Sequence, residues 1–170
     1  MSTKPEVARD QNQNGAGGKD SVAARWVAGF AEGWRDPRDP DSFCDHFESL
    51  LDPDVRLVQP QTRTVVGHRA FREQFARPLF ELVPDLHGTV KGWASNDEVI
   101  FINLRLEGTV GRRSFELRTC DQITLRDGKA IERIAHLDPT PLLRAVAFSP
   151  SSWPRFARMQ LRNRLRGARR

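Results

Sequence analysis

Hydrophobic residues beyond the first twenty positions recur at helical spacing. Apolar side chains stand four positions apart in the series Val22, Trp26, Phe30 and Trp34. Asp20 and Ser21 precede this series and belong to the residue types that cap helices, whereas Pro37 follows it and stops a helix. The pattern therefore predicts a first amphipathic helix between Ser21 and Pro37.

Two further helices are predicted before residue 85. A cap at Asp41 or Ser42 opens the second, whose buried side chains are Phe43, Phe47 and Leu50. A short strand over residues 55–59 follows. The third helix begins near Gly67 and ends before Pro84. Its inward-facing residues are Phe71, Phe75, Leu79 and Leu82, and Pro78 is expected to kink it.

From Leu86 onwards the hydrophobic period changes from helical to alternating. Strands are predicted over residues 86–94, 98–109, 114–125 and 130–138. Gly111-Arg112 and Asp127-Gly128 have the composition of two-residue hairpin turns. Helices followed by an antiparallel meander predict an α+β fold, with the helices packed on one face of the sheet.

The Gly111-Arg112 turn predicts a register for the strands on either side of it. The apolar face then contains the pairs Leu106–Leu117, Leu104–Thr119, Ile102–Asp121 and Ile100–Ile123. The opposite face contains Asn103, Arg105, Glu107, Glu116, Arg118 and Gln122. Charges of both signs alternate there, which is typical of a solvated or partner-facing surface.

One carboxylate, Asp121, interrupts the apolar face. Desolvation there would suit it to general acid or base chemistry. The alternative is a structural aspartate that hydrogen-bonds to neighbouring groups. A two-residue turn at Asp127-Gly128 pairs Asp121 with Ile134 and brings His136 and Asp138 to the same face, near Thr119. A three-residue turn would send His136 and Asp138 to the other face.

Asp138 also has a structural interpretation. Asp138-Pro139 and Thr140-Pro141 both have the form of a cap followed by a proline, which predicts a short helix through residues 142–146. Capping and chemistry are both open for Asp138. His46, His68 and His87 lack the spacing of metal ligands, so no metal site is expected.

Composition and cysteine usage narrow the class of protein. The chain has 170 residues, of which 38% are apolar and 29% charged, as expected for one globular domain. Its apolar runs are far shorter than the roughly 20 residues of a membrane-spanning helix. Cys44 and Cys120 are too few for a disulfide framework or a four-cysteine zinc site, so a cytoplasmic location is expected.

The net charge of +5 comes from the C-terminal segment. Eight of the 27 basic residues are arginines within residues 139–170, which contain no acid, so residues 1–138 carry 19 basic and 22 acidic residues and a charge of −3. We expect a disordered leader over residues 1–19, a folded domain over residues 20–148 and a basic tail over residues 149–170.

The tail has the pattern of a cationic amphipathic helix. Its predicted apolar face is Trp153, Phe156, Ala157, Leu161 and Leu165, and arginines occupy the rest of the helix surface. Such a helix can make a weak contact with an anionic membrane or nucleic acid. Alternatively, Trp153 and Phe156 dock on the domain and the arginines remain solvated.

The order of these elements resembles the SnoaL-like branch of the nuclear transport factor 2-like superfamily. The resemblance covers about residues 20–145 and rests on Pro60, Gly67, Pro84-Asp85, Asp127-Gly128-Lys129 and Leu137-Asp138-Pro139. It implies a cone of curved antiparallel sheet that three N-terminal helices close around an apolar pocket, and a homodimer through the outer sheet face. The family includes polyketide cyclases, ketosteroid isomerases, limonene-epoxide-hydrolase-like enzymes, dehydratases and members without demonstrated catalysis.

Residue matching to these enzymes is incomplete. Gln59 stands where ketosteroid isomerases have their general base, and the chain has no tyrosine for their oxyanion hole; Asp121 alone matches. Asp138 matches the last aspartate of the epoxide hydrolases, whose Arg and first Asp are missing here. Polyketide cyclases have a histidine at the position of Asp121 and an aspartate near the position of His136. The two residue types are therefore exchanged in this chain.

The resemblance predicts a pocket for a small apolar molecule, polycyclic or terpenoid-like. As an enzyme the protein would transfer a proton at carbon, in an isomerisation, cyclisation or dehydration, with Asp121 as acid or base, His136 as its partner and Asp138 as orienter. No cofactor is implied. The competing prediction is a non-catalytic ligand-binding or dimerisation module. The expected substrate-binding residues are Trp26, Phe30, Gln59, Trp93 and Thr119.

Overall fold

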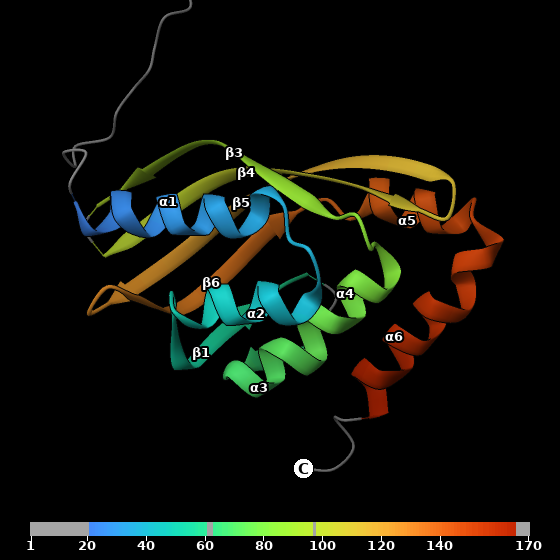
Figure 1. Ribbon diagram of the computed structural model, residues 1–170, viewed down its shortest axis with the longest axis horizontal. Coiled ribbons are helices and arrows are strands. Elements are labelled where there is room, and N and C mark those ends of the chain that lie inside the picture. The colour runs from blue at the N-terminus through green and yellow to red at the C-terminus, as the bar shows by residue number, and fades with distance from the viewer. Residues whose placement is uncertain (1–20, 61–62, 97, 166–170) are drawn as a thin grey trace, which may run out of the picture.

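The computed structural model describes residues 21–60, 63–96 and 98–165 (Figure 1). The leader expected over residues 1–19 lies outside these ranges. The helices are α1 (Val22–Arg35), α2 (Pro40–Glu48), α3 (His68–Ala70), α4 (Arg77–Leu82), α5 (Thr140–Ala147) and α6 (Trp153–Leu165). The strands are β1 (Leu51–Val58), β2 (Val65–Val66), β3 (His87–Ser95), β4 (Val99–Val110), β5 (Arg113–Arg126) and β6 (Lys129–Leu137).

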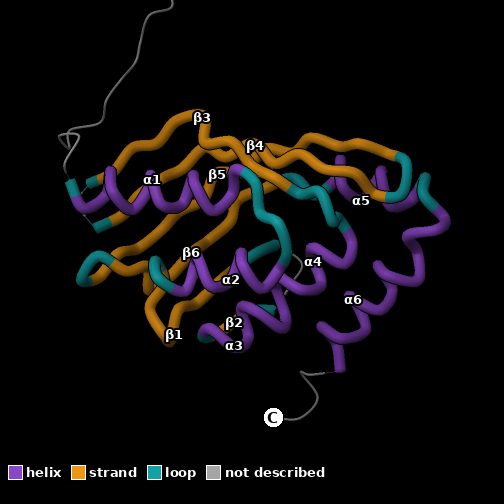
Figure 2. Tube along the Cα trace, viewed as in Figure 1, coloured by secondary structure: helices purple, strands orange, loops and turns teal. Residues whose placement is uncertain are grey.

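The strands form one curved sheet in the order β2-β1-β6-β5-β4-β3, and α1 to α4 pack together over one face of it (Figure 2). The α+β prediction is therefore confirmed, as are the four strands of the meander within one or two residues at each end. The pairing of β1 with β6 is parallel, while the remaining neighbours are antiparallel. The long separation in sequence of β1 from β6 is what permits a parallel pair.

The first two helices begin with side-chain caps. The Ser21 hydroxyl accepts a hydrogen bond from the backbone N–H of Ala24 at 3.1 Å, as expected. The cap predicted for the second helix was wrong by two residues, because Asp39 accepts the backbone N–H groups of Asp41 and Ser42, both at 2.9 Å. Pro40 then occupies the first turn, where no backbone donor is needed.

The third predicted helix is interrupted by a π-helical segment, Phe71–Ala76, between α3 and α4. Pro78 lacks a backbone N–H and crowds the preceding turn, and a wider turn before it relieves that conflict. The extra residue changes which side chains face inward. Phe80 is buried, whereas Leu79, predicted to be inward, is half-buried.

The register predicted for β4 and β5 is confirmed residue by residue, including the pairing of Ile102 with Asp121. The register predicted for β5 and β6 is wrong. Thr124 pairs with Glu132 and Leu125 with Ala130, so Ile131 is an unpaired bulge residue. The bulge shifts every later pair by one position and places Ala135, not Ile134, opposite Asp121.

The core is rich in aromatic rings contributed by the helices. Trp34 and Phe43 meet edge to face with centroids 4.9 Å apart, and Phe43 lies 4.5 Å from Phe47. Edge-to-face pairs of this kind add about 0.5–1.5 kcal/mol beyond burial. The thiol of Cys44 is buried beside them, and this burial raises its pKa to about 12. Cys44 therefore serves packing.

Candidate functional site

A cavity of about 810 Å³ lies between the helices and the sheet. Its walls come from the β1–β2 end of the sheet, from α3 and α4, from the core-facing residues of β4, β5 and β6, and from α5 and α6. The lining is mainly apolar, with Phe75, Leu79, Leu86, Leu106 and Leu117 among its members. Polar and charged side chains make up the smaller part of the lining, and their positions bear on what the cavity can recognise.

A buried ion pair lies at one wall of the cavity. Arg133, which is 7% exposed, donates from Nε and Nη2 to Oδ2 of Asp121 at 2.8 and 2.7 Å. The Thr119 hydroxyl donates to the other carboxylate oxygen, Oδ1, at 2.7 Å. Asp121 is fully buried behind Arg133 and does not line the cavity. Its carboxylate therefore holds Arg133 in place.

Arg133 is the member of the pair that lines the cavity. Its Nη1 atom makes no hydrogen bond to the residues that the structure describes, and its guanidinium carbon lies 5.7 Å from the centre of the Phe75 ring. Contact with the ring face further orients the cation. The arrangement directs a fixed guanidinium with spare donor capacity at whatever occupies the cavity.

Trp34 provides a second donor near Arg133. Its side chain is 2% exposed and its indole Nε1 has no hydrogen-bond partner among the described residues. Trp34 and Arg133 both line the cavity, and both also line a small void of about 20 Å³ inside the aromatic core. A buried N–H without an acceptor is costly, and this one is enclosed by the surrounding protein atoms.

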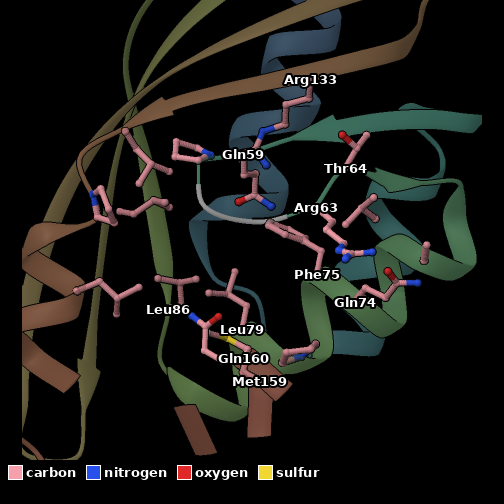
Figure 3. Close-up of a pocket in the computed structure, with 18 of the residues that line it drawn as sticks. Gln59, Arg63, Thr64, Gln74, Phe75, Leu79, Leu86, Arg133, Met159 and Gln160 are labelled. Carbon is pink, nitrogen blue, oxygen red and sulfur yellow. The ribbon is translucent and has the colours of Figure 1, made fainter. Parts of the chain in front are cut away.

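The titratable side chains that line the described part of the cavity are all basic: Arg63, His68, Arg69 and Arg133. Figure 3 shows Arg133, Gln59, Thr64 and Arg63 toward one end, and Leu79, Leu86 and Met159 toward the other. The cavity is thus amphipathic. Both ring nitrogens of His68 face protein acceptors: Nε2 lies 3.3 Å from the Leu51 carbonyl and Nδ1 lies 4.0 Å from a Glu48 carboxylate oxygen.

The structure brings only some of the predicted substrate-binding residues to the cavity. Gln59 lines it, and Thr119 supports Asp121 behind it. Trp26 and Phe30 instead belong to the aromatic core, where the Trp26 indole N–H donates to the Leu50 carbonyl at 2.9 Å. Trp93 is half-buried on β3 and packs against the core without lining the cavity.

The predicted convergence of His136 and Asp138 with Asp121 does not occur. The bulge at Ile131 turns His136 to the outer face of the sheet, where it is exposed and pairs across the strands with Cys120. The Asp138 side chain accepts the backbone N–H of Thr140 at 2.9 Å at the start of α5, and hydrogen bonds from Thr140 lower the pKa of that carboxyl. Asp138 therefore has a structural role at the start of α5, one residue before the N-cap residue Pro139.

Sequence reasoning missed Arg133 because the register predicted for β5 and β6, which lacked the bulge, placed Arg133 on the outer face. A signal was present: with a bulge, Arg133, Ala135 and Leu137 share the core face, whereas the predicted register requires Glu132 and His136 to be buried. The more apolar alternation was the correct one. Arg133 lies on this more apolar face, and the neighbouring strand has a buried aspartate, Asp121. Together they indicate a buried ion pair.

The C-terminal helix also contributes to the cavity. Phe156 and Met159 on α6 pack against the core and line the cavity, together with Gln160, and α6 lies beside α4 and α5 (Figure 1). The predicted apolar face was partly wrong, because Trp153 and Leu161 are 54% and 55% exposed. The tail thus docks on its own domain through a different face of the helix.

The described residues contain neither a candidate metal-binding cluster nor a candidate membrane-spanning helix. They contain no cluster of three His, Cys, Asp or Glu side chains arranged to hold a metal ion. None of their helices combines the length and apolar character needed to cross a bilayer. The predicted contact of the tail with an anionic surface stays a prediction.

Known proteins share this fold. The SnoaL-like domain family matches residues 23–133. A protein described as a SnoaL-like polyketide cyclase from Jannaschia sp. CCS1 superposes with a TM-score of 0.64 and 20% identity, over 74% of this chain and 91% of that one. TerC, crystallised with polyporic acid, superposes with a TM-score of 0.65 and 18% identity, over 75% of this chain and 99% of that one.

A third solved structure has a different kind of ligand. A hypothetical protein with a ketosteroid isomerase-like fold from Catenulispora acidiphila, in complex with trimethylamine, superposes with a TM-score of 0.61 and 13% identity, over 71% of this chain and 90% of that one. No curated protein matches the sequence. At these identities the structural likeness establishes the fold.

Proposed function

Because this chain belongs to the SnoaL-like domain family, we propose that it binds a small, largely apolar molecule in the cavity between its helices and its sheet. The observation that carries the proposal is a cavity of about 810 Å³ with Arg133 at its wall, held there by Asp121. Small-molecule sites typically have volumes of about 300–1,000 Å³ and few polar groups. TerC with polyporic acid and the Catenulispora protein with trimethylamine are relatives in fold that hold small molecules.

Filling the cavity is expected to abolish binding. Leu79 is half-buried and lines the cavity, so Leu79→Trp would place an indole in the ligand's space. Val22→Trp adds the same indole at a position that is 48% exposed and outside the cavity, and serves as the matched control. Fluorescence titration with pyrenebutyrate measures the affinity. We expect at least about a tenfold loss for Leu79→Trp alone; equal binding by both variants would place the ligand elsewhere.

Proton transfer at carbon is the second candidate, and Arg133 favours it. A fixed guanidinium beside the cavity would stabilise the oxyanion of an enolate, with Asp121 as the positioning residue. Binding ranks ahead of it because the described lining contains no carboxylate and His68 directs both nitrogens at protein acceptors. Proton NMR of tetralone in D₂O tests the reaction: catalysis requires faster loss of the α-proton signal than in buffer, with less acceleration by Arg133→Lys.

We also propose a homodimer through the outer face of the sheet. Arg105 there forms ion pairs with Glu107 at 3.0 Å and with Glu116 at 3.9 Å, and Phe101 on the same face is 45% exposed. An exposed ring among paired charges fits a self-complementary two-fold contact. Light scattering should give a dimer for the native chain and a monomer for Phe101→Lys, while Val66→Lys, at an exposed position on β2, leaves the dimer intact. A monomeric native chain at micromolar concentration contradicts the proposal.

A further inference from the structure

The charged groups around the cavity select a ligand of one sign. Arg63, His68, Arg69 and Arg133 line it, whereas no aspartate or glutamate does among the described residues; Asp121 and Glu48, which contact Arg133 and His68, lie outside the lining. Arg63 has no ion-pair partner among the described residues. Arg133 is buried beside the cavity, whereas Arg63 and Arg69 are exposed to solvent; because no carboxylate lines the described part of the cavity, these arginines favour an anion.

The buried polar groups of the cavity lining, Arg133 and Trp34, have unused donors. Asp121 occupies Nε and Nη2 of Arg133 but leaves Nη1 without a partner, and the buried indole N–H of Trp34 has no acceptor. Both groups can only donate. A ligand group that accepts hydrogen bonds would satisfy Nη1 of Arg133, whereas an ammonium or other donor would find no acceptor there.

The charged groups lie toward one end of the cavity, away from a region that is apolar apart from Gln160 (Figure 3). Arg133, Gln59 and Arg63 gather toward one end in Figure 3, and Leu79, Leu86 and Met159 toward the other. Building on the proposed small-molecule function, we infer that the ligand is an amphipathic carboxylic acid. Its carboxylate accepts hydrogen bonds from the guanidinium of Arg133, and its apolar body extends toward Leu79 and Met159.

The decisive experiment compares three probes of one shape on the native full-length chain. Pyrenebutyrate is an anion, its primary amide is neutral, and pyrenebutylamine is a cation. Fluorescence titration at neutral pH should give at least about tenfold tighter binding of the acid than of the amide, since charged hydrogen bonds exceed neutral ones, and the amine should bind most weakly.

Variants then test the role of Arg133. Replacing both partners, Asp121→Asn with Arg133→Gln, removes the pair without leaving one buried charge alone, and should reduce the acid-over-amide preference at least about threefold. Arg126→Gln is the control, because Arg126 is exposed and lies outside the cavity. The native-chain comparison decides the ligand class even where the double variant does not fold.

Each outcome separates the two levels of the proposal. Equal affinity for acid and amide overturns the carboxylate inference and leaves the small-molecule function standing. Failure of all three probes to bind at millimolar concentration overturns the small-molecule function and, with it, the inference. An acid preference that persists in the folded double variant removes Arg133 from carboxylate recognition.

Discussion

Asp121→Asn is expected to lower the free energy of unfolding by about 3–5 kcal/mol, the usual loss when one member of a buried ion pair is removed. Arg133 is 7% exposed, and the substitution leaves its guanidinium without a counter-charge. The carboxylate oxygen that accepts from Arg133 at 2.7 Å is replaced by an uncharged amide group. Urea unfolding followed by circular dichroism measures the change. A loss of stability is shown by a lower urea concentration at the midpoint of unfolding, with the dependence of the unfolding free energy on urea concentration unchanged.

Two variants make this result interpretable. Glu132 lies one residue before Arg133 on β6, and Glu132→Gln breaks its ion pair with Arg56 on β1; the loss should be less than about 1 kcal/mol because Arg56 is 59% exposed. Asp121→Leu combined with Arg133→Met replaces the pair by apolar side chains and should recover most of the lost stability. A stable Asp121→Asn protein would show that Asp121 is not the support of Arg133.

Replacing Phe156 and Met159 together by serine is expected to weaken pyrenebutyrate binding by about tenfold. Both side chains belong to α6 and line the cavity, and partial loss of two apolar contacts amounts to roughly 1–2 kcal/mol, or about tenfold per 1.4 kcal/mol. Fluorescence titration reports the affinity, and circular dichroism reports whether the fold persists.

The matched control uses the exposed side of the same helix. Ala157→Ser with Leu161→Ser changes two exposed apolar positions of α6, the second of them 55% exposed, and should leave pyrenebutyrate binding unchanged. Equal losses in the two double variants would mean that α6 acts through general stability. Native affinity in both would exclude α6 from the binding site.

The order and type of most elements could be predicted from the sequence because they follow from local patterns, whereas β2 and the π-helical segment were not predicted. The four-residue spacing of Trp26, Phe30 and Trp34 marks the buried side of α1. Gly111 adopts a positive φ of 63° in the β4–β5 turn, a conformation that glycine allows at little cost, so this turn defines the register of both strands. Local chemistry was sufficient in each case.

The arrangement of the site depended on the bulge residue Ile131, which the hairpin turn alone does not predict. Asp127 and Gly128 form the predicted two-residue turn, with Arg126 opposite Lys129, yet the bulge at Ile131 changes every pair beyond it. Whether a bulge forms depends on which side chains the whole sheet can bury. In β6 the two possible inward faces differ by only a few charges, because each contains apolar and charged residues. Arg133 therefore entered the core and His136 left it.

The sequence by itself determined that this chain is an α+β protein with a helix-covered sheet, a buried aspartate and a basic helical tail, since these depend on periodicity and residue type. Tertiary structure alone decided what the aspartate does, which wall the tail forms and where the polar groups of the cavity lie. Those features join β5 to β6 beyond a bulge in their hairpin, and α6 to α4, which is distant in sequence, and they depend on packing that pairs Asp121 with Arg133.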